Sequence, residues 1–138
     1  MYGALDISTS GMIAQRTRLD VASANLANAD TLLDSSLRLN PYQARRVMLA
    51  PASRDFKALG VRVAKIEIDR SPAPPGAFDP SNSLAYKDGP LAGYVARTNV
   101  DSIRENVNAM EAVRAYEANV MAAEASKAMF AATLRLIA

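Results

Sequence analysis

The sequence contains neither cysteine nor histidine, and these absences exclude several kinds of catalytic and metal site. Without cysteine there is no disulfide, thiolate metal ligand or cysteine nucleophile. Without histidine the chain lacks the most common general base and the most common metal ligand, so Ser-His-Asp triads and typical zinc sites are excluded. The glycines do not cluster into a phosphate-binding loop. We therefore expect a protein that is not an enzyme and that binds no metal or other cofactor.

Tryptophan is also absent, and only eight of the 138 residues are aromatic, whereas 27 are alanine. Alanine buries little surface, so this composition favours closely packed helices over a thick globular core. The net charge is only +2 and no run of Lys or Arg occurs, so nucleic-acid binding is not expected. No apolar run approaches the roughly 20 residues of a membrane span, and no N-terminal pattern predicts a cleaved signal peptide.

Proline and glycine divide the chain into three predicted segments, 1–30, 31–98 and 99–138. All seven prolines and four of the six glycines lie between residues 30 and 98. This middle segment predicts a small β-rich lobe or an extended arm, with strand-like patterns at 42–50 and 60–70. In the second strand the alternation of β-branched residues shifts by one position at Ala64, which predicts a β-bulge.

Both terminal segments show helical periodicity. Residues 99–102 offer several N-cap candidates for the C-terminal helix, Asp101 among them, and Ser102 with Glu105 fits a capping box. In the N-terminal helix, Gly11 lowers helix stability by about 1 kcal/mol relative to alanine. In the N-terminal segment, large apolar residues recur every seven positions and form a heptad-like seam, namely Leu5, Met12, Leu19 and Leu26. In the C-terminal segment, an apolar stripe comprises Ile103, Val107, Met110, Val113, Tyr116, Val120, Phe130, Leu134 and Ile137.

These patterns predict a mainly α protein whose long N- and C-terminal helices pair as a coiled coil. The C-terminal helix has a second apolar flank, which includes Met121 and Met129, and a single helix partner would leave this flank in water. We therefore expect association with further copies or other partners, and the seam and stripe residues named above are the candidate subunit-packing residues. A soluble helical adaptor or export chaperone that binds a partner helix in a groove is the alternative.

Short motifs at both ends resemble the flagellar basal-body rod proteins. The N-terminal motifs are SGMIAQ at 10–15 and ANLANADT at 24–31. The C-terminal motifs NVD at 99–101 and RAYEAN at 114–119 are similar to those of the proximal-rod members of this family. The resemblance extends over nearly the whole chain, but residues 31–46 depart from the family pattern.

The resemblance implies a structural subunit of the proximal rod, in the periplasmic part of the flagellar basal body. It implies export by the flagellar type III apparatus without a cleaved signal peptide. It further implies that the terminal helices assemble helically, with copies of the same chain and with other rod proteins, into the drive shaft required for motility. Besides the adaptor or chaperone, the sister proximal-rod protein is a second alternative.

Overall fold

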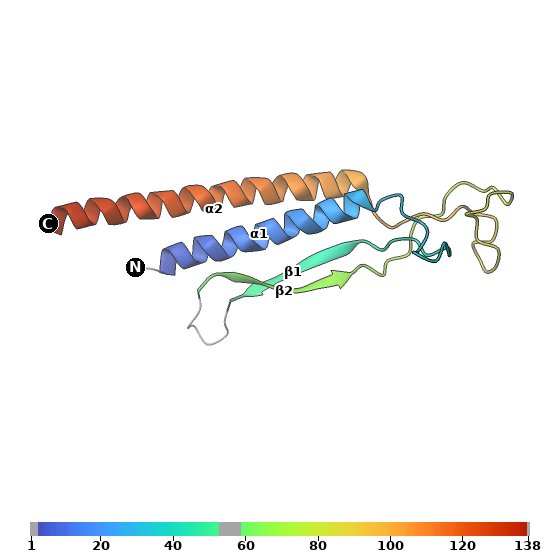
Figure 1. Cartoon of the computed structure of the whole chain (residues 1–138), viewed down its shortest axis with the longest axis horizontal. Coiled ribbons are helices and arrows are strands. Elements are labelled where there is room, and N and C mark those ends of the chain that lie inside the picture. The colour runs from blue at the N-terminus through green and yellow to red at the C-terminus, as the bar shows by residue number, and fades with distance from the viewer. Residues whose placement is uncertain (1–2, 53–58, 138) are drawn as a thin grey trace.

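Two long helices and a β-hairpin form the computed structural model, which describes residues 3–52 and 59–137. The elements follow in the order α1 (Gly3–Ala27), β1 (Arg45–Pro51), β2 (Val61–Ile68) and α2 (Ser102–Ile137). The two helices run antiparallel and side by side, α1 lies between α2 and the hairpin, and the long loops extend beyond one end of the helix pair (Figure 1). This arrangement confirms the predicted mainly α fold with two long terminal helices and a small β-rich middle.

The contact between α1 and α2 is made by small side chains. The buried residues of α1 include Gly11, Ala14 and Ala22, and the buried residues of α2 include Ala112. A Cβ atom at Gly11 would lie 2.8 Å from the side-chain amide of Asn119, so a larger residue at this crossing would require the Asn119 side chain to move. Small residues let the two helix backbones approach closely, which explains how an alanine-rich chain builds a helix pair with a thin core.

The hairpin carries the predicted β-bulge. Met48 pairs with Lys65 but Leu49 pairs with Val63, so Ala64 has no partner on β1. The extra residue keeps β-branched side chains on both sides of the bulge on one face of the hairpin, where an uninterrupted ladder would turn half of them to the other face. The residues that share this face on β2 are Val61, Val63, Ile66 and Ile68.

Helix α2 is capped by Asp101. Its Oδ1 atom accepts hydrogen bonds from the backbone N–H groups of Ile103 at 3.0 Å and Arg104 at 3.3 Å. The predicted capping box between Ser102 and Glu105 is therefore wrong by one position. Ser102 already lies inside the helix, and the Glu105 carboxylate accepts a hydrogen bond from α1 instead.

The loops beyond the helix pair are held by isolated β-bridges, one between Phe78 and Tyr94 and one between Ala85 and Val95. The rings of Phe78 and Tyr94 meet edge to face with their centroids 5.2 Å apart. Over the ranges that the structure describes, neither helix combines the length and the apolar character needed to cross a membrane.

The segment that departs from the family pattern contains a small turn closed by a bridge between Leu33 and Leu39. The Asp34 carboxylate accepts hydrogen bonds from the backbone N–H groups of Ser36 and Arg38. At the tip, Leu37 has a φ of +57° and is 81% exposed. A left-handed conformation costs a non-glycine residue roughly 1–2 kcal/mol, and the exposed side chain recovers little of this cost by burial.

Replacement of Leu37 by asparagine is expected to raise the free energy of unfolding by up to about 1 kcal/mol, because asparagine tolerates the left-handed region better. Urea denaturation of the two proteins measures the difference. Leu39→Asn is the control, since Leu39 is half-buried and lies in the closing bridge, and it should destabilise the protein. A loss of stability in Leu37→Asn would contradict the interpretation of strain at this tip.

Candidate functional site

Asn25, near the C-terminal end of α1, is fully buried and joins three elements of the fold. Its side-chain nitrogen donates to the backbone carbonyl of Arg45 and to the Glu105 carboxylate, both at 2.9 Å. Its side-chain oxygen accepts the Arg45 N–H at 2.9 Å and the Tyr42 hydroxyl at 3.1 Å. One amide thus links α1 with the start of β1 and with the first turns of α2. We call this set of contacts the Asn25 junction.

Helix α1 also holds the opposite end of the hairpin. The Ser10 hydroxyl accepts the backbone N–H of Val61 at 3.1 Å and donates to the Ile7 carbonyl at 2.7 Å. Gly60, just before β2, has a φ of +109°, and a Cβ atom there would collide with the Ser10 side chain. The hairpin is therefore fixed to α1 at both ends, so its position relative to the helix pair is set by hydrogen bonds.

Asn99 connects the middle segment to the start of α2. Its side-chain oxygen accepts the Ala44 N–H at 2.7 Å, and its side-chain nitrogen donates to the carbonyl of Asp69 at 2.8 Å and to that of Ser71 at 3.1 Å. One amide thus contacts the residue just before β1 and two residues just after β2. Asn25 and Asn99 lie in the motifs that carry the family resemblance, and in the structure their side chains connect separate segments of the chain.

Asp69 follows β2 and is well hydrogen-bonded. Its carboxylate accepts the hydroxyl and the N–H of Ser71 and forms an ion pair with Arg46. The two hydrogen bonds from Ser71 are the main cause that lowers the pKa of Asp69 below its ordinary value of 3.8, and the charges of Arg46 and Arg104 act in the same direction. The fold therefore favours the ionised form of the Asp69 carboxyl group.

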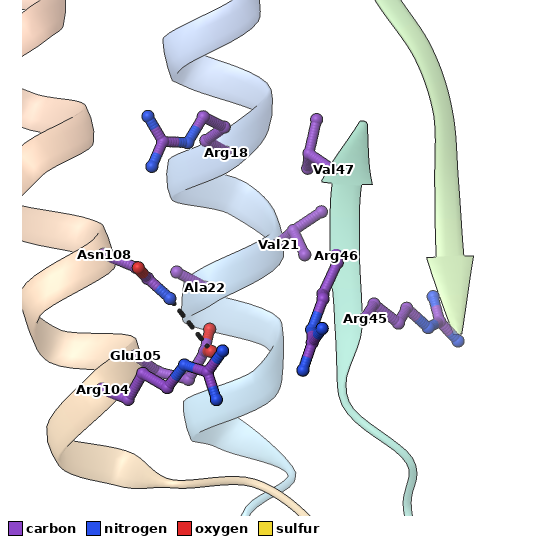
Figure 2. A pocket seen from close by; sticks show the side chains of 9 residues that line it. All are labelled: Arg18, Val21, Ala22, Arg45, Arg46, Val47, Arg104, Glu105 and Asn108. Carbon is purple, nitrogen blue, oxygen red and sulfur yellow. Dashed lines mark hydrogen bonds between the residues drawn. The ribbon is translucent and has the colours of Figure 1, made fainter. Parts of the chain in front are cut away.

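A pocket of 240 Å³ lies between α1, α2 and β1, next to the Asn25 junction (Figure 2). The side chains of Arg18 from α1 and Arg104 from α2 extend into the space between the two helices. Glu105 accepts a hydrogen bond from the side-chain amide of Asn108 at 3.2 Å. The pocket is lined by Arg18, Val21, Ala22, Arg45, Arg46, Val47, Arg104, Glu105 and Asn108.

The heptad-like seam of α1 does not form the buried centre of the helix pair. Its four residues, Leu5, Met12, Leu19 and Leu26, are half-buried, while the buried positions between them are small or polar. The seam residues thus flank the contact with α2 and keep part of their surface accessible. Their role in packing between subunits stays a prediction.

The apolar stripe of α2 is largely exposed in the single chain. Ile103 is 78% exposed and Leu134 is 68% exposed, whereas Val120 and Phe130 are half-buried. The side chain of Ile137 lies outside the described residues. The other stripe residues are also exposed, namely Val107, Met110, Val113 and Tyr116. The fold brings none of these exposed side chains into a closed core, so they remain available to a neighbour.

The contact between α1 and α2 is built by small residues, which a pattern of large apolar residues does not reveal. On α1 the buried residues are Ser8, Gly11, Ala14, Ala22 and Asn25, mostly spaced by three or four. This spacing is itself a helical pattern, and it predicts the contact when small residues are counted among the packing positions.

Helix α2 extends past the start of α1. Gly11 lies opposite Asn119 and Asn25 contacts Glu105, so the two contacts are separated by equal numbers of residues on both helices. The same register places Gly3 opposite the region of Lys127, and Figure 1 shows the end of α2 projecting beyond α1. We call residues 128–137 the α2 overhang. At 1.5 Å per residue it is about 15 Å long.

The comparisons with known proteins agree at both ends of the chain and over its length. A family described as "Flagella basal body rod protein" matches residues 5–32, and one described as "Flagellar basal body rod FlgEFG protein C-terminal" matches residues 91–136. The chain is 33% identical to flagellar basal-body rod protein FlgC of Borreliella burgdorferi, over 99% of this chain and 97% of that protein. It is 37% identical to FlgC of Salmonella typhimurium, over 95% of this chain and 93% of that protein.

Replacement of Asn25 by alanine is expected to lower the free energy of unfolding by roughly 3 kcal/mol, because several buried polar groups would lose their partner. Asn28→Ala is the matched control: Asn28 directly follows α1, and its side chain bonds only to nearby residues, donating to the Ala24 carbonyl and accepting the Thr31 hydroxyl. Thermal or urea denaturation compares the two variants. Equal losses would contradict a special role of the Asn25 junction.

The Asp69 carboxylate contributes to the free energy of unfolding, and this contribution falls as the solution becomes acidic. Because its pKa is lower in the folded state than in the unfolded state, the contribution is complete above the ordinary value of 3.8 and is lost as the pH falls through the folded value. Urea denaturation between pH 6 and 2.5 is expected to show a smaller acid-dependent loss of stability in Asp69→Asn and in Ser71→Ala than in the unaltered protein. An unchanged acid dependence in both variants would contradict this assignment.

Proposed function

The chain belongs to the flagellar basal-body rod protein family, and on this premise we propose that it is a structural subunit of the proximal rod. Its relatives named FlgC match it over nearly their whole length and its own. The proposal assigns the chain no catalytic activity. The similarity to FlgC does not favour the adaptor or chaperone, nor the sister proximal-rod protein.

The observation that carries the proposal is the exposed apolar surface of α2, and above all its overhang. On the overhang, Met129 is 63% exposed, Leu134 is 68% exposed and Leu136 is 88% exposed. Burial of a large apolar side chain stabilises an assembly by about 1.5–3 kcal/mol, repeated at every subunit contact. A helix end that projects beyond the described start of α1 with these side chains exposed is suited to insertion between neighbouring subunits.

Within this proposal, the terminal helices assemble helically with copies of the same chain and with other rod proteins. The seam and stripe residues are the subunit-packing residues: they flank the small-residue contact on α1 or lie exposed on α2. The small residues hold the chain together, and the large ones are left for neighbours. The segments 1–30 and 99–138 then act as one helical packing unit, and residues 31–98 lie outside it.

The proposed place of action is the periplasmic part of the basal body, reached through the flagellar type III export apparatus. Membership of the rod family supports both points, because a rod subunit has to be delivered to the far side of the inner membrane. No step of this route requires chemistry by the chain itself.

A carboxylate in place of a large apolar side chain of the overhang should block rod assembly, whereas one in place of an alanine next to Arg135 should be tolerated. Leu134→Asp and Ala131→Asp both introduce one negative charge at an exposed position of the same helix end. Leu134→Asp places this charge in the surface that neighbours would bury, at a cost of several kcal/mol per contact. Ala131 lies three residues before Leu134, about 60° around the helix from it, and four residues before Arg135, so its replacement removes no large apolar side chain and adds the negative charge next to a positive one.

The two variants are compared in cells whose own copy of the gene has been deleted. We expect Leu134→Asp to be exported but absent from isolated basal bodies, and the cells to be non-motile. Ala131→Asp should be incorporated and should support swimming. Normal rods and motility with Leu134→Asp would overturn the assembly role of the overhang.

A further inference from the structure

The pocket beside the Asn25 junction collects positive charge from three elements. Arg18 comes from α1, Arg45 and Arg46 from β1, and Arg104 from α2, whereas Glu105 is the only carboxylate that lines it. Residues so far apart in the sequence meet there only because the hairpin is fixed to α1 and α2 lies along its other side. The cluster is therefore a product of the fold and is not visible as a basic run in the sequence.

The carboxylates of the described chain do not fully compensate these arginines. Arg46 is paired with Asp69, and Arg18 reaches Glu111 only at 3.8 Å, with the Glu111 side chain 63% exposed. Glu105 is engaged by the side-chain amides of Asn25 and Asn108.

Two arginines of the pocket form no ion pair with any described residue of the chain. The guanidinium group of Arg45 lies over the Tyr42 ring at 5.9 Å, and Arg104 acts on the Asp69 carboxylate through its charge without forming an ion pair with it. The pocket thus retains an excess of positive charge.

We infer that this pocket binds a carboxylate side chain presented by a neighbouring copy of the same chain. The inference rests on the proposed function, because the packing of copies in a rod brings carboxylates to this surface at high local concentration. The planar guanidinium groups of Arg18 and Arg104, which extend into the space between the helices, match a carboxylate well, and the partly apolar wall formed by Val21, Ala22 and Val47 strengthens such bonds.

The surface of α2 offers the complementary group. Glu117 and Glu124 are exposed, and neither forms an ion pair with another described residue. Glu117 also lines a shallow groove on α2 together with the exposed residues Met110 and Val113. A neighbour that is displaced along the helix axis would therefore bring a glutamate to the pocket while burying apolar surface.

A charge-swap experiment in the full-length chain tests this pairing. Arg18→Glu combined with Arg104→Glu should reduce incorporation into basal bodies about tenfold or more, because the pocket would then repel the carboxylate. Addition of Glu117→Arg or Glu124→Arg to the same chain should restore most of the incorporation. Arg38→Glu combined with Arg62→Glu is the matched control, since both arginines are exposed and lie outside the pocket.

Normal incorporation of the pocket variant, or an equal loss in the control, would overturn the inference. Failure of both glutamate swaps to restore incorporation would also overturn it. If the unaltered chain builds rods in the same cells, the proposed function stands in each of these cases. If the unaltered chain is itself absent from isolated basal bodies, the proposed function fails.

The absence of cysteine provides a second measurement that does not require charge reversal. Chains with Arg104→Cys and chains with Glu117→Cys are produced together, and isolated basal bodies are treated with a short bis-maleimide. A cross-linked dimer is expected from this pair and not from Arg62→Cys with Glu117→Cys. If Glu124→Cys also fails to cross-link to Arg104→Cys, the assignment of the partner to a second copy is wrong.

Discussion

The buried amide of Asn25 is the interaction on which the rest of the structure depends. A hairpin of two short strands has little stability of its own, and two alanine-rich helices bury little surface between them. Asn25 connects these weak elements by bonding the backbone of β1 and the carboxylate of α2 at once. Burial of an amide is favourable only when all of its hydrogen bonds are made, so this junction also selects one arrangement of the three elements.

Close approach of the helices has a consequence for assembly. Because Gly11, Ala14, Ala22 and Ala112 occupy the contact within the chain, the large apolar residues are displaced to its flanks and to the outside. A globular protein would bury these side chains in its own core. Here the apolar residues of α2 stay exposed and form a surface that neighbouring subunits can bury, which is the property that a subunit of a helical assembly requires. The same division places polar amides at the crossing and leaves the overhang projecting beyond the described start of α1.

The middle segment is organised to remain attached to this helix pair. The bulge at Ala64 keeps the β-branched residues of β2 on one face, and Ser10 and Asn25 hold the two ends of the hairpin. Positive charge from three elements then surrounds the pocket between the helices and β1. Hydrogen bonds from the side chains of α1 to the hairpin backbone fix where the two ends of the hairpin lie.

By itself the sequence determined the two terminal helices, the β-rich middle, the bulge at Ala64 and the family. Each of these depends on periodicity or on a local motif, which a single chain displays directly. Only the tertiary structure decided that small residues and Asn25 make the internal contact and that four arginines share one pocket. The physical reason is that these features depend on how closely two backbones approach and on which distant groups then meet. Such distances follow from packing and not from spacing along the chain.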